Sequence, residues 1–169
     1  MEEYSKALSF YDKALEIRQK ILPSNHPSLA TSYNNIGLVY ETMGKYSKAL
    51  SSHEKALEIY QKTLPSNHPS LATSYNNIAS VYYSMRDYSN ALTFHEKALE
   101  IKQKTLPSDH PDLTSSYNKI GSVYDSMREY SEAHSYYQRA LGIKQHTLPP
   151  THRNIRTVKE GIEIVKTKL

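Results

Sequence analysis

Four histidines recur along the chain at a constant spacing of 42 residues and are the first side chains that could do chemistry: His26, His68, His110 and His152. Imidazoles that share a zinc ion must each lie about 2 Å from it. One histidine in each 42-residue unit places these side chains about one unit apart, which is too far for a shared ion. We therefore predict that they cap or pack their loops, and that the chain binds no metal.

Catalysis would require a nucleophile, a general base or a phosphate-binding loop at one unique place. Nearly every polar residue instead has a counterpart 42 positions away, and the five glycines are scattered singly. Two further histidines, His53 and His95, stand where other units carry tyrosine, so we expect them in the core or at an interface. The sequence therefore predicts a protein that is not an enzyme and needs no cofactor.

The 21 basic and 17 acidic residues give a net charge of +4, which leaves nucleic acid open as a partner. In three units a lysine follows a glutamate by four residues, the favourable order for an ion pair on a helix. The pairs are Glu16–Lys20, Glu58–Lys62 and Glu100–Lys104. A second basic column comprises Lys13, Lys55, Lys97 and Arg139. We expect the charge to be largely self-paired on the outer face, and predict no nucleic acid partner.

The chain contains no cysteine, which favours a reducing compartment. Its start, MEEYSKALSF, is acidic and lacks the basic and apolar regions of a signal peptide. No apolar run approaches the ~20 residues of a membrane span. We therefore expect a cytoplasmic protein with no membrane partner.

The helices that carry these residues can be predicted from a sequence repeat of 42 residues. The unit Leu22 to Thr63 starts again at Leu64, with 32 of 42 positions identical. Apolar residues at three- and four-residue steps predict a first helix from Pro27 to Met43, which Gly44 ends. A second stripe predicts another helix from about Ser47, whose hydroxyl can cap its first turn. Each unit is thus an antiparallel helix pair.

Within the unit, one spacing of aromatic and small residues resembles the tetratricopeptide repeat: Tyr33, Ile36, Gly37, Tyr40, Gly44, Tyr46, Ala49 and Ala56. The period of 42, the LPSNHP connection and the YNNI run are similar more narrowly to the kinesin light chain type of array. The resemblance implies an all-α fold, a right-handed α-solenoid of antiparallel helix pairs with the tetratricopeptide-like superhelix.

We expect one solenoid domain with five parts. They are a half repeat at 1–21 with only the second helix, repeats at 22–63, 64–105 and 106–147, and a C-terminal capping helix at 148–169. The half repeat lacks a partner helix for its apolar face, which includes Leu8 and Phe10. This face is a candidate docking edge and indicates possible self-association through the N-terminal half repeat.

In arrays of this family the concave groove is lined by the first helix of each unit and binds short unstructured peptides. The resemblance implies twelve peptide-binding residues there: Asn34, Asn35, Leu38, Glu41, Asn76, Asn77, Ser80, Tyr83, Asn118, Lys119, Ser122 and Asp125. A solvated asparagine ladder can pair with a peptide backbone, because the amide both donates and accepts. It is also possible that one asparagine of each pair only bonds a neighbouring helix, above all Asn35 and Asn77.

Two functions remain in competition. The first is a non-catalytic protein–protein interaction module, an adaptor or scaffold that binds an extended peptide along the concave face. The alternative is a structural or sensor arm of a larger multidomain protein, which acts through its ends and through self-association.

Overall fold

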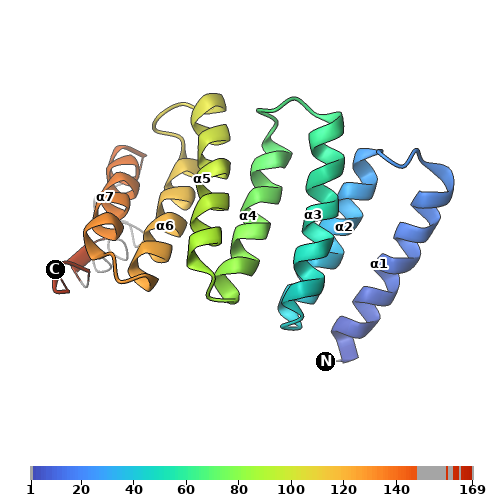
Figure 1. The fold of residues 1–169 in the computed structure, drawn as a ribbon. Helices are drawn as coiled ribbons and strands as arrows, with labels where there is room; N and C mark the ends of the chain where they lie inside the picture. The colour runs from blue at the N-terminus through green and yellow to red at the C-terminus, as the bar shows by residue number, and fades with distance from the viewer. Residues whose placement is uncertain (1, 148–158, 160–161, 164, 169) are drawn as a thin grey trace. The chain divides into compact units, whose positions relative to one another are not determined.

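The computed structural model describes residues 2–147, 159, 162–163 and 165–168. These residues form seven helices and no strand (Figure 1). The helices are α1 (Glu2–Ile21), α2 (Pro27–Thr42), α3 (Tyr46–Thr63), α4 (Pro69–Ser84), α5 (Tyr88–Thr105), α6 (Pro111–Ser126) and α7 (Tyr130–Thr147). The chain divides into two compact units, Met1–Asp87 and Tyr88–Leu169. Their boundary falls inside the predicted repeat at 64–105, and the division into repeats stays a prediction.

Histidine begins the first helix of each full repeat. The backbone N–H of Ser28 donates to Nδ1 of His26 at 3.2 Å, and Ser70 and Asp112 donate to His68 and His110 at 3.1 and 3.2 Å. A proline follows each histidine at the first helical position, where its missing N–H costs nothing. The predicted capping role is therefore confirmed for three histidines, while His152 lies outside the described residues.

The same helices end in a left-handed residue. In α2 the N–H of Gly44 donates to the carbonyl of Glu41 and that of Lys45 to the carbonyl of Tyr40, both at 2.9 Å. This pair of hydrogen bonds is a Schellman motif. Gly44 has φ +69°, and Arg86 and Arg128 take φ +62° and +64° at the equivalent ends of α4 and α6.

The predicted start of the second helix was one residue late. Helix α3 begins at Tyr46, and its N-cap is Lys45, whose side chain makes no capping bond. Ser47 therefore lies inside the first turn, and the expectation that its hydroxyl caps the helix is wrong.

In the first unit α1 to α4 lie side by side in chain order (Figure 1), and each helix packs on the next. Small residues allow this approach, since Ala30, Ala49 and Ala56 are fully buried. Gly37 of α2 lies directly against the ring of His53 on α3, where a Cβ would come within 2.6 Å of the imidazole. The close packing of α2 on α3 therefore depends on the small residues at their contact.

Glutamine–tyrosine bonds join each second helix to the next first helix. Gln19 Nε2 donates to the Tyr33 hydroxyl at 3.1 Å, and Gln61 Nε2 donates to the Tyr75 hydroxyl at 3.2 Å. Within the second unit the third bond of this kind joins Gln103 and Tyr117 at 3.2 Å. These bonds recur once per repeat and help to fix the register between neighbouring helices.

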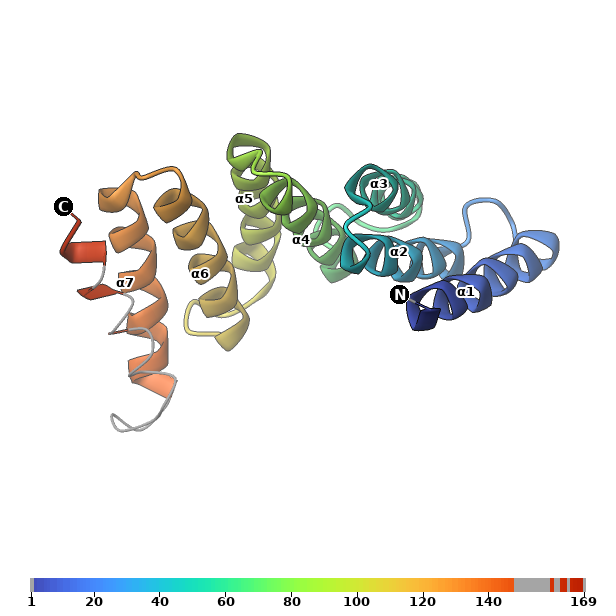
Figure 2. The ribbon, with the colours of Figure 1, turned by 90° about the horizontal axis from the view of Figure 1, so that it is seen from below.

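The second unit contains α5 to α7 (Figure 2), and residues from all three helices form its apolar core. Leu99, Leu113, Ile120 and Ile143 form this core. Tyrosines pack around it, and the rings of Tyr124 and Tyr136 stack at a centroid distance of 5.5 Å. The capping helix expected at 148–169 lies mostly outside the described residues. Two described residues of this segment, Ile162 and Val165, are buried.

Candidate peptide-binding face

The predicted peptide-binding residues of the first unit lie on α2 and α4, which contact each other. We call the surface formed by Asn35, Leu38, Asn77, Ser80 and Tyr83 the α2/α4 face. Leu38 and Tyr83 are 45% and 38% exposed and offer apolar area to a ligand. The other three side chains are partly exposed and can also reach a ligand.

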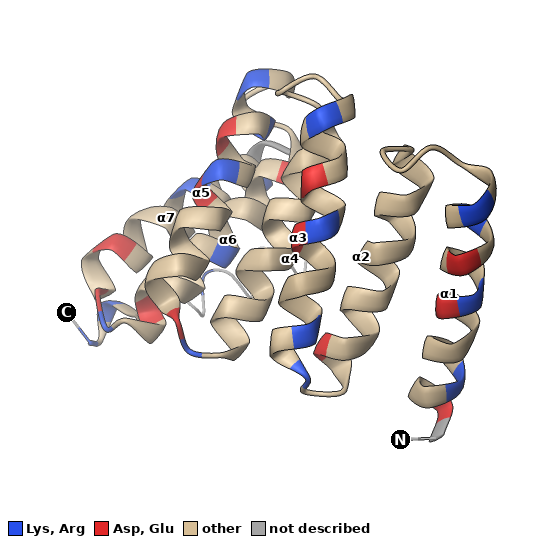
Figure 3. Cartoon of the chain, turned by 45° about the vertical axis from the view of Figure 1, so that its right-hand side comes forward, with Lys and Arg blue, Asp and Glu red and all other residues tan. Residues whose placement is uncertain are grey.

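This surface carries little charge. Glu41 is the only acidic or basic residue of α2, and α4 has none. Figure 3 shows the contrast with α1 and α3, along which lysine, arginine and acidic residues follow one another. The neutral character expected from the sequence therefore holds for α2 and α4, and a ligand there would be recognised by shape and hydrogen bonds.

The column of Asn34 and Asn76 is not solvated. His53 Nδ1 donates to Oδ1 of Asn34 at 3.0 Å, across the contact between α2 and α3. Asn76 is only 9% exposed. The expectation that these amides are solvated in the free protein is wrong for Asn76, which is buried, while Asn34 is half-buried and bonded to α3. Asn77 is more exposed than Asn76, whereas Asn34 and Asn35 are both half-buried.

In the second unit the four predicted residues on α6 differ in their surroundings. Oδ1 of Asn118 is buried and has no hydrogen-bond partner in the described part. The hydroxyl of Ser122 lies 3.2 Å from the hydroxyl of Tyr137 and donates to the carbonyl of Asn118 at 3.0 Å. Asp125 is paired with Lys168 at 2.9 Å. Lys119 is exposed, so it is the member of this group most accessible to a ligand.

The two buried histidines are packing groups. Burial lowers the pKa of His53 from 6.5 to about 4. Burial, together with the charges of Lys119 and Lys102, lowers the pKa of His95 to about 4 as well. Both imidazoles are therefore neutral at physiological pH. The described residues contain no group of three metal-ligating side chains that could hold an ion, near these histidines or elsewhere.

The outer helices carry both paired and unpaired lysines. Lys20, Lys62 and Lys104 bond to their glutamates at 2.6–2.7 Å, as the sequence predicted. Lys48 and Lys55 do not follow this rule. Their ammonium groups lie 5.6 Å and 5.5 Å from the ring centroids of Tyr40 and Tyr33. Neither forms an ion pair with any described residue, so the expected self-pairing does not extend to Lys48 and Lys55.

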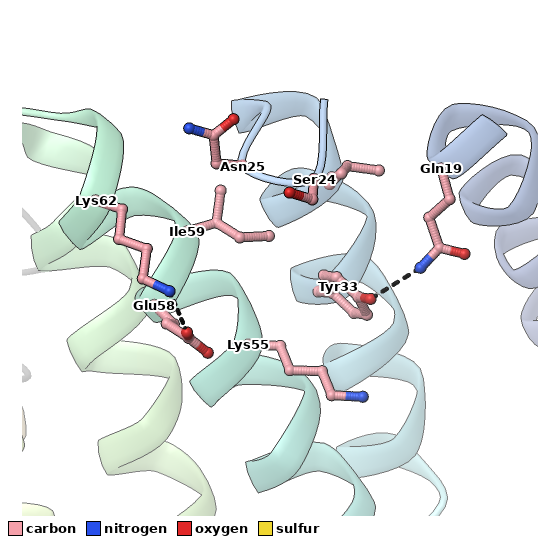
Figure 4. A pocket seen from close by; sticks show the side chains of 9 residues that line it. Gln19, Ser24, Asn25, Tyr33, Lys55, Glu58, Ile59 and Lys62 are labelled. Atoms are coloured by element: carbon pink, nitrogen blue, oxygen red, sulfur yellow. Dashed lines mark hydrogen bonds and ion pairs between the residues drawn. The ribbon is translucent and has the colours of Figure 1, made fainter. Parts of the chain in front are cut away.

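Two hollows lie between α1 and α3, above α2. One has a volume of about 540 Å³, with Gln19, Tyr33, Lys55 and Lys62 in its lining (Figure 4). The other, about 400 Å³, is lined by Asp12, Tyr33, Tyr40, Lys48 and Lys55, among others. The sequence analysis did not predict these hollows. The seven-residue spacing of Lys48, Lys55 and Lys62 on one helix could have indicated them.

Antiparallel helices that pack in chain order within each unit, with no strand among the described residues, define an all-α solenoid of helix pairs. The family model of the tetratricopeptide repeat matches residues 1–62 and 67–146. The chain therefore belongs to the tetratricopeptide repeat family. Members of this family serve in general as scaffolds for protein–protein interaction.

Solved structures support this assignment. The chain is 24% identical to nearly identical TPR-like repeats ascribed to a kinesin light chain of Podosopora anserina, with a TM-score of 0.87 over 99% of this chain and 79% of that one. BtubC (BKLC) from P. vanneervenii is 26% identical, with a TM-score of 0.87 over 98% of this chain and 66% of that one. The apo form of RapI is 20% identical, with a TM-score of 0.83 over 98% and 58%. The protein thus resembles the kinesin light chain type of repeat.

No curated protein matches the sequence closely enough to count as a relative. In the described part of the chain, no helix combines the length and the apolar character that crossing a bilayer requires.

Proposed function

We propose that the protein is a non-catalytic adaptor or scaffold that binds an extended peptide along the α2/α4 face. The observation that carries this proposal is the exposure of Leu38 and Tyr83 on two contacting helices that have almost no charge. Large exposed apolar side chains rimmed by polar ones are typical of interaction sites. The proposal includes the cytoplasmic location that the absence of cysteine favours.

The proposed roles of the residues follow their exposure. Leu38 and Tyr83 bury apolar side chains of the peptide, while Asn35 and Asn77 bond its backbone groups. Asn34 and Asn76 lie behind this surface and act on it only by holding the helices in place.

A peptide-array screen followed by variant binding tests this proposal. We expect Leu38→Ser and Asn77→Ala each to weaken a selected peptide by about tenfold, because each loses a contact made only in the complex. Lys20→Ala is the matched outer-face control, since Lys20 is exposed and paired only with Glu16. Equal affinities for all three variants and the parent protein would contradict the proposal.

A specific observation also favours the alternative, association through the N-terminal half repeat. Tyr11 of α1 is 37% exposed, while His53 at the equivalent place in α3 is fully buried against α2. Phe10, Ile17 and Ile21 of α1 are exposed as well, although the predicted Leu8 is half-buried. We infer that this exposed apolar face of α1 binds a second copy of the chain.

Light scattering over a concentration series tests this second proposal. We expect a dimer at high concentration that Phe10→Glu weakens, because the new carboxylate must be desolvated in the interface. Thr93→Glu, which places the same charge on an exposed position of α5, should leave the mass unchanged. A monomer at every concentration would rule out this mode of association.

A further inference from the structure

The two hollows between α1 and α3 meet at Tyr33 and Lys55, which line both of them. We call this continuous surface the outer groove and define it by Asp12 and Gln19 of α1, Tyr33 and Tyr40 of α2, and Lys48 and Lys55 of α3. Its tyrosines are partly buried in the floor, and its lysines are exposed on one wall. The groove is distinct from the α2/α4 face, with which it shares no residue.

The groove repeats itself along its length. Among the residues that line the two hollows, each helix contributes a pair seven positions apart: Asp12 and Gln19, Tyr33 and Tyr40, Lys48 and Lys55. The lining also includes Glu58, which is paired with Lys62. Seven residues are about 10.5 Å along a helix. A bound α-helix presents equivalent side chains every seven residues at the same distance. An extended peptide presents them every two residues, about 7 Å apart, and does not match this period.

The charges give the groove a preferred ligand. Lys48 and Lys55 lie above tyrosine rings and have no ion-pair partner among the described residues. Contact with the ring removes part of the water around each ammonium and holds it in place, so that a carboxylate can pair with it at a smaller entropic cost. Asp12 stands on the opposite wall and repels an acidic side chain there.

We propose that the outer groove binds an acidic α-helix of a partner protein. Glutamate or aspartate side chains at positions i and i+7 of this helix pair with Lys48 and Lys55. The helix turns its acidic stripe toward α3 and an uncharged or basic side toward Asp12 and Gln19. The protein would then contact partners on two surfaces, the α2/α4 face and the outer groove.

A single-stranded nucleic acid is the competing ligand for a surface of lysine and tyrosine. Binding of that kind depends on bases that stack on open aromatic faces. Here the ammonium groups of Lys48 and Lys55 lie over the rings of Tyr40 and Tyr33, so these faces are occupied. The geometry therefore favours the acidic helix.

Fluorescence anisotropy with a synthetic peptide tests the proposal. The probe is a labelled 22-residue helical peptide with glutamates at a seven-residue spacing, and its partner probe has the same composition with the glutamates at alternate positions. We expect saturable binding of the first peptide and binding at least about tenfold weaker of the second. Equal binding of both peptides, or no saturable binding of the first, would overturn the proposal.

Variants of the protein locate the site. We expect Lys48→Ala with Lys55→Ala to weaken the first peptide by about tenfold or more, and Asp12→Asn to strengthen it by about twofold to fivefold, since one charge attracts and the other repels. Lys13→Ala is the matched control, because Lys13 holds on α1 the place of Lys55 on α3 and does not line the groove. All of these residues are exposed, so the fold should be unaffected.

The remaining outcomes each decide against the proposal. If Lys13→Ala weakens the peptide as much as the double variant, the attraction is unspecific. If Leu38→Ser abolishes binding instead, the peptide lies on the α2/α4 face. If an oligothymidylate binds more tightly than the peptide and depends on Lys48 and Lys55, the groove is a nucleic acid site.

Discussion

His53 Nδ1 donates a hydrogen bond of 3.0 Å to Oδ1 of Asn34 across the contact between α2 and α3. Gly37 makes this bond possible, because a Cβ at that position would come within 2.6 Å of the imidazole ring. An asparagine that resembles a ligand contact in the sequence is therefore part of the helix pair itself.

Asn34→Ala should lower stability. The substitution leaves the buried N–H of His53 without an acceptor, which costs about 1–3 kcal/mol. Chemical denaturation measures this loss. The control is Asn35→Ala at the next position, on the α2/α4 face, which should change stability by less than about 0.5 kcal/mol. The reverse order of the two variants would show that Asn34 is not the structural member of the pair.

Stability should fall in mild acid. Burial lowers the folded-state pKa of His53 to about 4, while the unfolded chain takes up a proton near pH 6.5. The unfolded state therefore binds more protons as the pH falls from 6.5 toward 4, and the stabilisation present above pH 6.5 is lost in that window. For His53 alone we expect a loss of about 2 kcal/mol between pH 7 and pH 5. His95 adds to it for the same reason.

A double variant isolates the contribution of His53 to this pH dependence. His53→Tyr with Leu38→Ser reproduces the arrangement of Tyr137 and Ser122 in the second unit, whose hydroxyls lie 3.2 Å apart. We measure the free energy of unfolding by urea denaturation at pH 7, 6 and 5. Between pH 7 and pH 5 it should fall by about 2 kcal/mol less in this variant than in the parent protein. The capping histidines are the same in both proteins, so equal losses would mean that His53 is not the titrating group.

Arg86→Gly should stabilise the protein. Arg86 has φ +62° at the end of α4, a conformation that strains any residue with a Cβ, and Gly44 fills the equivalent position of α2. We expect a gain of about 0.5–1 kcal/mol, measured as a rise in the thermal midpoint. Gly44→Ala is the converse test and should cost a similar amount, although a Cβ there touches nothing.

Ser74→Ala should be neutral or stabilising. The hydroxyl of Ser74 is buried without a partner, because Tyr60 on α3 lies within hydrogen-bond distance of Thr31 instead, at 3.2 Å. The equivalent Ser32 on α2 is bonded by Arg18 of α1. Removing an unpaired buried hydroxyl saves about 1 kcal/mol, while Ser32→Ala loses a charged bond and should cost about 1–2 kcal/mol. Denaturation midpoints of the two variants test this prediction. An equal loss of stability in Ser74→Ala and Ser32→Ala would contradict it.

The local structure and the family could both be predicted from the order of the amino acids. Histidine before proline starts a helix, and glycine permits the left-handed end, so α2 could be bounded to within one residue from Pro27 and Gly44. The apolar period gave the helix pair, and the 42-residue repeat gave the stacked array. These features depend on neighbours in the chain, which is why they can be read without coordinates.

Tertiary structure decided which polar side chains are available. Asn34 and Asn35 are adjacent in sequence but about 100° apart around the helix, so the packing of α3 on α2 determines which amide is bonded. Likewise Lys55 could be expected to pair with a glutamate on its own helix, yet it lies over Tyr33 of another helix. Such choices depend on the rotation of each helix toward its neighbours, a relation between segments that no local pattern contains.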